Sequence, residues 1–195
     1  MDTKRTFKPA IRCGIEIVCG PMFAGKTEEL MRRVRRASIA GYKVGLFKHS
    51  FDTRYSSEHV VSHDGNKLPV SLIHDPKELL AAAAPFDLIA IDEVQFFPLE
   101  IIDVIRNFSE TKRIILAGLD SDFRHEPFGP MPTLLAIAEH AVKLSAICAS
   151  CGGSAHFTQR LVDGRPARYN DPLIAIGGKE AYQPRCRRCY QPAER

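Results

Sequence analysis

The sequence predicts an α/β fold in which helices cover both faces of a mainly parallel sheet. Largely apolar runs of strand length occur at residues 15–19, 44–47, 88–91, 114–117 and 142–147. Helical patterns alternate with them after residue 27 and at residues 76–84, 98–109 and 131–140. Pro98 suits the first turn of its helix. Apolar strands separated by helices are typical of parallel sheets covered on both sides.

Two segments depart from this alternation. Residues 60–61 and 68–73 flank Asp64 and Gly65, a pattern that indicates a β-hairpin. After residue 147 the chain becomes rich in Gly, Pro and Arg. We therefore expect an α/β domain over residues 1–147, with a projecting hairpin at about 48–75, and a small domain over residues 148–195.

Composition narrows the class of protein. Of the 195 residues, 45% are hydrophobic and 26% charged, as in ordinary globular domains. No apolar run is long enough for a membrane span, and the basic N-terminal stretch lacks the features of a signal peptide, so a cytoplasmic location is expected. The net charge of +4 is too small for a typical nucleic-acid surface. The basic stretch at 32–36 is interpreted as a solvated helix face.

A phosphate-binding loop follows the first predicted strand. The pattern G-x-x-x-x-G-K-[ST] is matched without exception by Gly20, Pro21, Met22, Phe23, Ala24, Gly25, Lys26 and Thr27. The strand before it and the helix after it argue against an ordinary glycine-containing turn. Such a loop directs backbone N–H groups at phosphate oxygens, while Lys26 reaches the β- and γ-phosphates and the Thr27 hydroxyl binds Mg²⁺. The sequence therefore predicts binding of a nucleoside triphosphate.

An acidic pair, Asp92 and Glu93, ends the third predicted strand. A carboxylate at the end of a buried strand near a phosphate loop commonly holds Mg²⁺, the role expected of Asp92. Glu93 points differently and suits a general base that takes a proton from an acceptor hydroxyl. The alternative is an acidic pair that only faces solvent. Phe96 and Phe97 follow, either as core residues or as a wall on which a base stacks.

Two C-x-x-C pairs enclose the C-terminal segment, Cys148 with Cys151 and Cys186 with Cys189. Four thiolates in this spacing form a closed tetrahedral zinc site with a structural role. The alternative is a pair of disulfides or a redox centre, which a chain without a secretory signal disfavours. Cys13 and Cys19 are interpreted as ordinary buried thiols.

These motifs together resemble the type II (cytosolic, zinc-containing) thymidine kinase family, and more closely its bacterial members. The resemblance runs from about residue 20 to 190 and rests on the phosphate loop, the two cysteine pairs, and the stretches at residues 52–57, 92–97, 119–123, 127–129 and 176–178. It implies a RecA-like P-loop domain and a C-terminal lasso, held by zinc, that closes over a nucleoside. The implied reaction transfers the γ-phosphate of ATP, with Mg²⁺, to the 5′-hydroxyl of thymidine and also of deoxyuridine.

The resemblance also implies roles for individual residues. Glu93 is the general base, and the nucleotide and metal site takes in Asp52, Thr53, Arg54, Asp92 and Gln95. Phe123 stacks on the thymine and Tyr182 is a lasso contact. Main-chain hydrogen bonds to the base come from Leu173, Ile174, Ala175, Ile176 and Gly177. The remaining pocket wall consists of Met22, Phe96, Leu119 and Phe128. The family is typically homotetrameric, inhibited by dTTP, and active in nucleotide salvage for DNA synthesis.

The sequence departs from the family pattern at two places, and two other functions remain as alternatives. The lasso at residues 163–172 is longer than in animal members, which shifts the expected main-chain contacts by a residue or so, and Val94 stands where animal members carry glycine.

A nucleic-acid-dependent ATPase would share Asp92 and Glu93 but needs a second motor domain. A non-enzymatic zinc-ribbon module would leave Glu93 and Phe123 without a role.

Overall fold

A computed structural model describes residues 13–50, 59–61, 67–173 and 181–193. Its centre is a six-stranded sheet in the order β5-β2-β6-β7-β1-β8, and every neighbouring pair is parallel. These strands are β1 (Gly14–Cys19), β2 (Val44–His49), β5 (Ser71–Ile73), β6 (Leu88–Asp92), β7 (Arg113–Gly118) and β8 (His140–Lys143). The predicted α/β class with a mainly parallel sheet is therefore confirmed.

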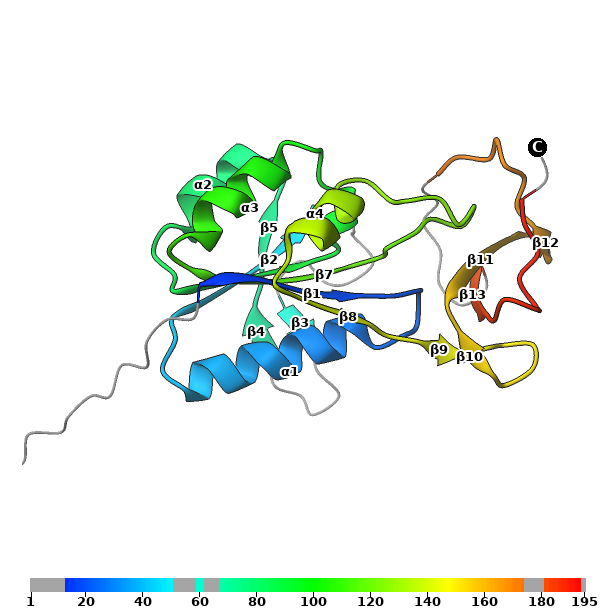
Figure 1. The fold of residues 1–195 in the computed structure, drawn as a ribbon, viewed down its shortest axis with the longest axis horizontal. Coiled ribbons are helices and arrows are strands. Elements are labelled where there is room, and N and C mark those ends of the chain that lie inside the picture. The colour runs from blue at the N-terminus through cyan, green and yellow to red at the C-terminus, as the bar shows by residue number, and fades with distance from the viewer. Residues whose placement is uncertain (1–12, 51–58, 62–66, 174–180, 194–195) are drawn as a thin grey trace, which may run out of the picture.

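Helices cover both faces of this sheet (Figure 1). Helix α1 (Lys26–Ile39) packs on one face through a cluster that includes Leu30, Val34 and, from the sheet, Ala90. The other face carries α2 (Pro76–Ala83), α3 (Ile101–Ser109) and α4 (Met131–Ile137). Because β6 is buried along its whole length, its continuous apolar sequence is explained by these two layers.

The strand order brings the phosphate loop and the acidic pair to one edge of the sheet. Strand β7 lies between β1, which leads into the phosphate loop, and β6, which ends at Asp92. This order, with one strand inserted between the two, is that of RecA-like P-loop domains. The carboxyl ends of parallel strands share one edge, where open α/β sheets bind ligands.

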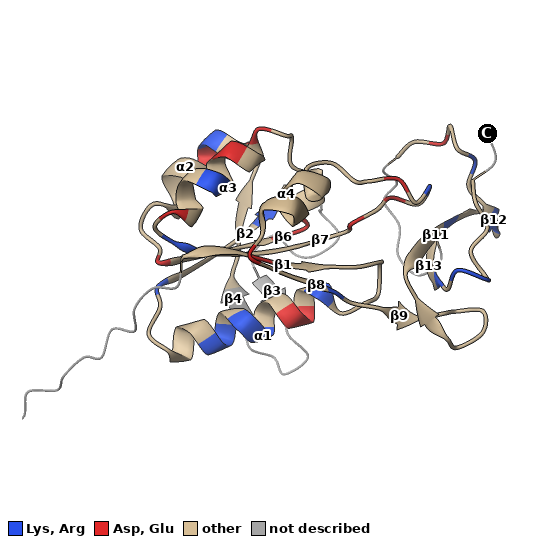
Figure 2. Cartoon of the chain, viewed as in Figure 1, with Lys and Arg blue, Asp and Glu red and all other residues tan. Residues whose placement is uncertain are grey.

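The basic stretch on α1 is only in part the solvated helix face that was expected: Arg32 and Arg36 are exposed, whereas the Arg33 side chain is 10% exposed (Figure 2). Arg32 is exposed and donates to Glu29, while Arg33 bonds both Glu29 and Glu16 of β1. Arg113 of β7 also pairs with Glu16. These contacts tie α1 to the sheet and give the arginines a structural explanation.

Two predicted helix boundaries were wrong. Helix α3 begins at Ile101, because Phe97 is extended and the Pro98 carbonyl accepts the Ile101 N–H in a turn before the helix. Helix α4 ends at Ile137, because Glu139 instead bonds the main chain of Ile15, with its N–H donating to the Ile15 carbonyl over 3.1 Å. Tertiary pairing with β1 overrides the helical pattern over residues 138–140.

The predicted strand at 142–147 divides into two strands of different sheets. Its first part belongs to β8 in the main sheet, and its last part is β9 (Ala146–Ile147), which pairs with β10 (Ser154–Ala155). The Leu144 N–H donates to the Cys19 carbonyl over 2.8 Å, so the chain leaves the main sheet just beyond this point.

The predicted hairpin is present in part. Strands β3 (His59–Val61) and β4 (Lys67–Pro69) form an antiparallel pair, and the residues between them lie outside the described part of the chain. Its second arm is shorter than expected, because residues 71–73 form β5 and extend the main sheet beside β2.

A second unit lies at one end of the main sheet (Figure 1). In addition to β9 and β10 it contains β11 (Phe157–Val162), β12 (Arg165–Pro166) and β13 (Tyr182–Arg185), with β11 in the middle of a three-stranded antiparallel sheet. We call residues 146–191 the cysteine-bearing module. Among the described residues, no helix combines the length and apolar character needed to span a membrane.

Candidate active site

The phosphate loop joins the end of β1 to the start of α1, and its glycines are required by its geometry. Gly20 has φ 139°, and a Cβ atom there would lie 2.5 Å from the Leu144 carbonyl oxygen. Gly25 has φ 81°, the left-handed conformation that caps the start of α1. The loop therefore ends directly at the helix N-terminus, where backbone N–H groups and the helix dipole favour anions.

Lys26 is buried among acidic groups. Its Nζ donates to the Pro21 carbonyl over 2.8 Å, which folds the side chain back along the loop. Burial lowers the pKa of Lys26, and the negative charges of Glu93, Asp92 and Asp120 oppose this shift. The arrangement holds a cation beside the loop, where the charge can bind phosphate oxygens.

Thr27 and Asp92 connect the phosphate loop to the acidic strand. The Thr27 hydroxyl donates to Asp92 Oδ2 over 2.9 Å, and Asp92 is only 2% exposed. Burial and the neighbouring Glu93 charge raise the pKa of Asp92 to about 6, against the opposing effects of Lys48, Thr27 and Lys26. A hydroxyl and a carboxylate this close are hard oxygen ligands of the kind Mg²⁺ prefers, so both residues fit the predicted metal role.

Lys48 is a charged residue of this site that the sequence analysis missed. It is buried in β2, and the sheet register places it directly beside Asp92 of β6. A lysine at the end of an apolar strand is the signal that could have identified it, since a buried lysine needs a compensating charge.

Glu93 adopts an unusual backbone conformation. Its φ of 54° and ψ of 41° lie in the left-handed region, which is uncommon for a residue with a Cβ and is found preferentially at functional sites. Gln95 Nε2 donates to Glu93 Oε2 over 2.6 Å, and Gln95 Oε1 accepts the Leu119 N–H over 3.0 Å. The carboxylate is therefore oriented through Gln95 by the backbone at the end of β7.

Aromatic residues line the adjacent region. The rings of Phe96 and Phe128 meet edge to face at 5.7 Å, and Leu119 and Phe128 are each 8% exposed. These residues of the predicted pocket wall thus lie next to Glu93 and Gln95. Phe97, in contrast, is part of the main core, so the core interpretation holds for that residue.

Phe123 is buried in a setting that the sequence did not predict. The guanidinium groups of Arg124 and Arg160 lie over its ring at 5.1 and 5.3 Å from the centroid. Arg160 is itself buried and donates to the Pro172 carbonyl, one residue before the predicted main-chain contacts. No motif marks Arg160, because its position in β11 becomes meaningful only when β11 packs beside Phe123.

Some of the remaining predicted site residues are described by the structure and others are not. Met22 and Phe23 lie in the loop, half-buried and exposed respectively, Tyr182 is buried in β13, and Leu173 is partly exposed. Asp52, Thr53 and Arg54 and residues 174–177 lie outside the described part of the chain.

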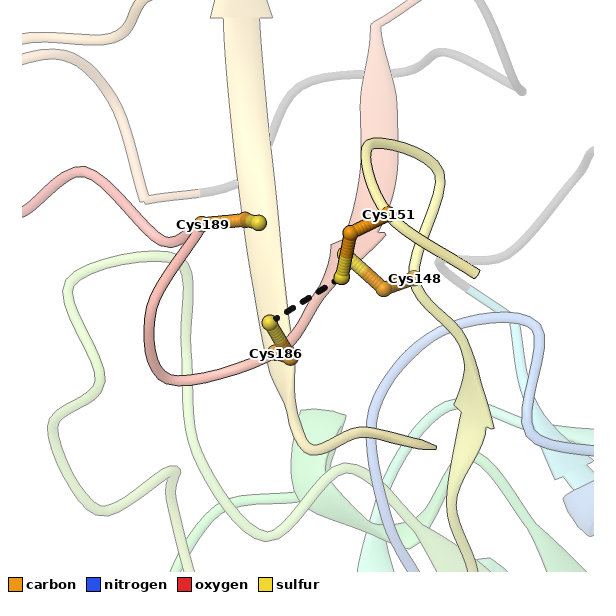
Figure 3. Close-up of side chains that lie close together, drawn as sticks. All are labelled: Cys148, Cys151, Cys186 and Cys189. Carbon is orange, nitrogen blue, oxygen red and sulfur yellow. Dashed lines mark hydrogen bonds between the residues drawn. The ribbon is translucent and has the colours of Figure 1, made fainter. Parts of the chain in front are cut away.

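The four paired cysteines converge in the cysteine-bearing module (Figure 3). All four Sγ atoms lie within 4.8 Å of one another, and Cys151 Sγ is 3.6 Å from Cys186 Sγ. Tetrahedral zinc with bonds of about 2.3 Å needs sulfur atoms about 3.8 Å apart, so this cluster could bind zinc. All four are free thiols, and so are Cys13 and Cys19. Cys19 is buried as predicted, whereas Cys13 is exposed, so the prediction of a buried thiol was wrong for Cys13.

A RecA-like sheet, a complete phosphate loop, an acidic strand end bonded to that loop and a tetrathiol cluster define a P-loop nucleotide-binding protein with a zinc-type module. Comparison with known families gives the next level of detail. The family model described as thymidine kinase matches residues 13–190, which is most of the chain. The chain belongs to the thymidine kinase family.

The solved structures that match this chain have low sequence identity to it. The ATPase DotB of Legionella pneumophila is 17% identical, with 66% of this chain and 35% of that chain covered and a TM-score of 0.41. A DNA replication initiation factor is 15% identical, with 68% and 40% covered and a TM-score of 0.41. The flagellar accessory protein FlaH from Methanocaldococcus jannaschii is 13% identical, with 74% and 76% covered and a TM-score of 0.49. The chain thus spans well under half of the first two proteins, and the family assignment rests on the family match.

Proposed function

We propose that this protein is a thymidine kinase that transfers the γ-phosphate of ATP to the 5′-hydroxyl of thymidine, giving dTMP and ADP. Deoxyuridine is proposed as a second acceptor. The observation that carries the proposal is the 2.9 Å bond from Thr27 to Asp92, because it joins the phosphate loop to the strand end that also presents Glu93. The residues proposed for donor binding and for the general base thus lie at the same edge of the sheet.

The phosphate loop is proposed to bind the donor. Its backbone and Lys26 would hold the ATP phosphates, with residues 52–54 and Gln95 completing the nucleotide and metal site. Thr27 and Asp92 would hold Mg²⁺, which neutralises negative charge on the phosphates when bound. The loop and the metal ligands position the donor in line with the acceptor oxygen.

Glu93 is proposed as the general base. Its carboxylate takes the proton of the 5′-hydroxyl as that oxygen attacks the γ-phosphorus and the bond to the β-phosphate oxygen breaks. Gln95 supports this role, since its amide donates to Glu93 while its carbonyl is held by Leu119. The amide orientation follows from this network, because only the amide oxygen can accept the Leu119 N–H.

The nucleoside is proposed to lie between Phe123 and the wall formed by Met22, Phe96, Leu119 and Phe128. Residues 173–177 would bind the base through main-chain groups and Tyr182 would contribute from β13. A pocket of this kind selects the base by its size, so a purine or a pyrimidine with a bulky 5-substituent is excluded sterically. Closure of the lasso over the nucleoside would exclude water and limit phosphate transfer to solvent.

The remaining properties are proposed from the same family assignment. The cysteine-bearing module would hold one structural zinc through Cys148, Cys151, Cys186 and Cys189. A homotetrameric assembly, inhibition by dTTP and a cytoplasmic role in nucleotide salvage are further parts of the proposal.

The test is transfer of labelled γ-phosphate from ATP with Mg²⁺ to each deoxynucleoside in parallel. The proposal expects label on thymidine and deoxyuridine and none on the purine deoxynucleosides or deoxycytidine. Label released only as free phosphate, and faster with DNA, would instead identify a nucleic-acid-dependent ATPase. Tight ATP binding with neither transfer nor hydrolysis would identify a non-enzymatic switch module.

A further inference from the structure

The phosphate loop is held from outside its own domain by the cysteine-bearing module. The Met22 N–H donates to Thr158 Oγ1 over 3.0 Å, and Thr158 is 4% exposed in β11. Ala24 of the loop packs against the small buried cluster of Ala146, Cys148 and Ala155, against which Cys186 and Cys189 also pack. Two residues of the loop therefore contact the module, one of them at the cluster that includes Cys148.

The same module also holds the segment that carries Phe123. The Tyr190 hydroxyl donates to the Phe123 carbonyl over 2.7 Å. Tyr190 directly follows Cys189, and its own N–H donates to the Cys186 carbonyl over 2.9 Å, within the turn of the second cysteine pair. Its ring stacks on Phe157 at 4.7 Å between centroids. The geometry of that cysteine turn thus sets where the Tyr190 hydroxyl lies.

These contacts join one unit to two different loops of the α/β domain. Thr158 reaches the proposed donor loop, and Tyr190 reaches the loop proposed to bind the acceptor base. The module's own position depends on the cysteine cluster, because the cysteines belong to both of its ends, before β10 and after β13. Zinc would draw these ends together and so restrict where Thr158 and Tyr190 lie.

We propose that the zinc-loaded module acts as a brace between the two substrate loops, with Thr158 and Tyr190 as positioning residues, so that zinc binding and substrate binding strengthen each other. The inference rests on the proposal that residues 20–27 bind ATP phosphates, and the role assigned to Tyr190 also rests on the proposal that thymidine binds at Phe123. Linkage requires reciprocity: if zinc orders the loops for their ligands, the bound ligands must retain zinc.

The first experiment measures the zinc dissociation constant by equilibrium competition with a chromogenic chelator, for the protein alone, with ADP and with thymidine. ADP at saturation should tighten zinc binding by about fivefold or more, within the usual range of coupling between sites. The same zinc dissociation constant with and without ADP would overturn the proposal.

The second experiment uses variants that remove one hydrogen bond and little else. Thr158→Val keeps the side-chain shape but cannot accept the Met22 N–H, so ADP should bind about three- to tenfold more weakly and lose its effect on zinc affinity. Thr158→Ser keeps the hydroxyl and should behave like the parent protein. ADP affinity unchanged in Thr158→Val at full zinc content would contradict the brace.

Tyr190→Phe removes the hydroxyl but keeps the stacked ring, so it should weaken thymidine binding about three- to tenfold and leave ADP affinity unchanged. Equal losses for both ligands in both variants, together with a lower melting temperature, would mean that the contacts only stabilise the fold and would overturn the assigned roles. If the parent protein binds ADP but no thymidine, the proposal that thymidine is the acceptor fails. The measurements with ADP would still test whether zinc binding and nucleotide binding are coupled.

Discussion

The side-chain amide of Gln95 links the Glu93 carboxylate to the main chain of Leu119. Gln95 Nε2 donates to Glu93 Oε2 over 2.6 Å, and its Oε1 accepts the Leu119 N–H over 3.0 Å. Gln95 is buried, and Gly118 lies so close to it that an added Cβ would be 2.7 Å from its Oε1. Glu93 is thereby oriented by a side chain that packs closely against the end of β7.

Two substitutions test the two hydrogen bonds of the Gln95 side chain, to Glu93 and to Leu119. In Gln95→Met both bonds are lost, so kcat should fall and the buried Leu119 N–H should lose its acceptor, which costs about 1–3 kcal/mol of unfolding free energy. Gln95→Glu retains an acceptor for Leu119 but faces Glu93 with a like charge, so kcat should fall and the buried pair of carboxyl groups should cost stability that grows as pH rises. Steady-state kinetics and urea unfolding of both variants measure this. Unchanged kcat in both would remove Gln95 from its orienting role.

Glu93→Gln tests the proposed base. The substitution keeps the shape and can still accept from Gln95, but it cannot take a proton from the acceptor hydroxyl. Turnover should fall by about 10²- to 10⁴-fold while ATP binding is retained. Glu100→Gln, at an exposed position before α3, is the matched control and should leave turnover unchanged. Near-normal turnover of Glu93→Gln would assign the base elsewhere.

Asp92→Asn should stabilise the protein at neutral pH while abolishing its activity. Because the pKa of Asp92 is raised from 3.8 to about 6, its ionised form is disfavoured in the folded state, and its contribution to stability falls as pH rises through about 6. The neutral variant avoids this loss and should be more stable by about 1–3 kcal/mol at pH 8.

Unfolding in urea without Mg²⁺, at pH 8 and at pH 5, measures this difference. The advantage of Asp92→Asn should shrink by about half at pH 5, where much of the parent protein carries a protonated Asp92. A difference that does not vary with pH would show that packing, and not ionisation, distinguishes the two proteins.

Cys186→Ser should release the metal and unfold the cysteine-bearing module. Structural zinc provides about 10–16 kcal/mol of apparent binding free energy in small zinc peptides, which is more than a module of this size can replace. Metal analysis should show loss of zinc, and limited proteolysis should cut after residue 145. Cys13→Ser, at an exposed cysteine outside the cluster, is the control and should keep both zinc and protease resistance. Full zinc content in Cys186→Ser would contradict the tetrathiolate site.

Phe123→Leu tests the proposed stacking of the base. Loss of an aromatic partner typically costs about 1–3 kcal/mol per stacked base, so the KM for thymidine should rise about 5- to 150-fold with the KM for ATP unchanged. Phe108→Leu on α3 removes a ring that packs against the main core and serves as the control. If both variants change KM for thymidine equally, Phe123 does not contact the base.

Several features of this protein are determined by short stretches of sequence. The phosphate loop is a local motif, since its glycines and the following helix fix the backbone within a few residues of one another. The alternation of apolar strands and helices likewise predicts a parallel sheet, because each strand must be buried on both faces. The two C-x-x-C pairs predict a four-thiol cluster from spacing alone, and the cysteine cluster is present as expected.

Other features depend on contacts between residues far apart in the chain, and only the tertiary structure decided them. Helix α4 ends early because Glu139 bonds Ile15, and Lys48 acquires its place beside Asp92 from the order of the strands. The contacts of Thr158 with Met22 and of Tyr190 with Phe123 join segments that share no sequence pattern. Local periodicity and motifs report the energetics of neighbouring residues, whereas these bonds exist because the sheet and the cysteine cluster bring distant segments within hydrogen-bonding distance.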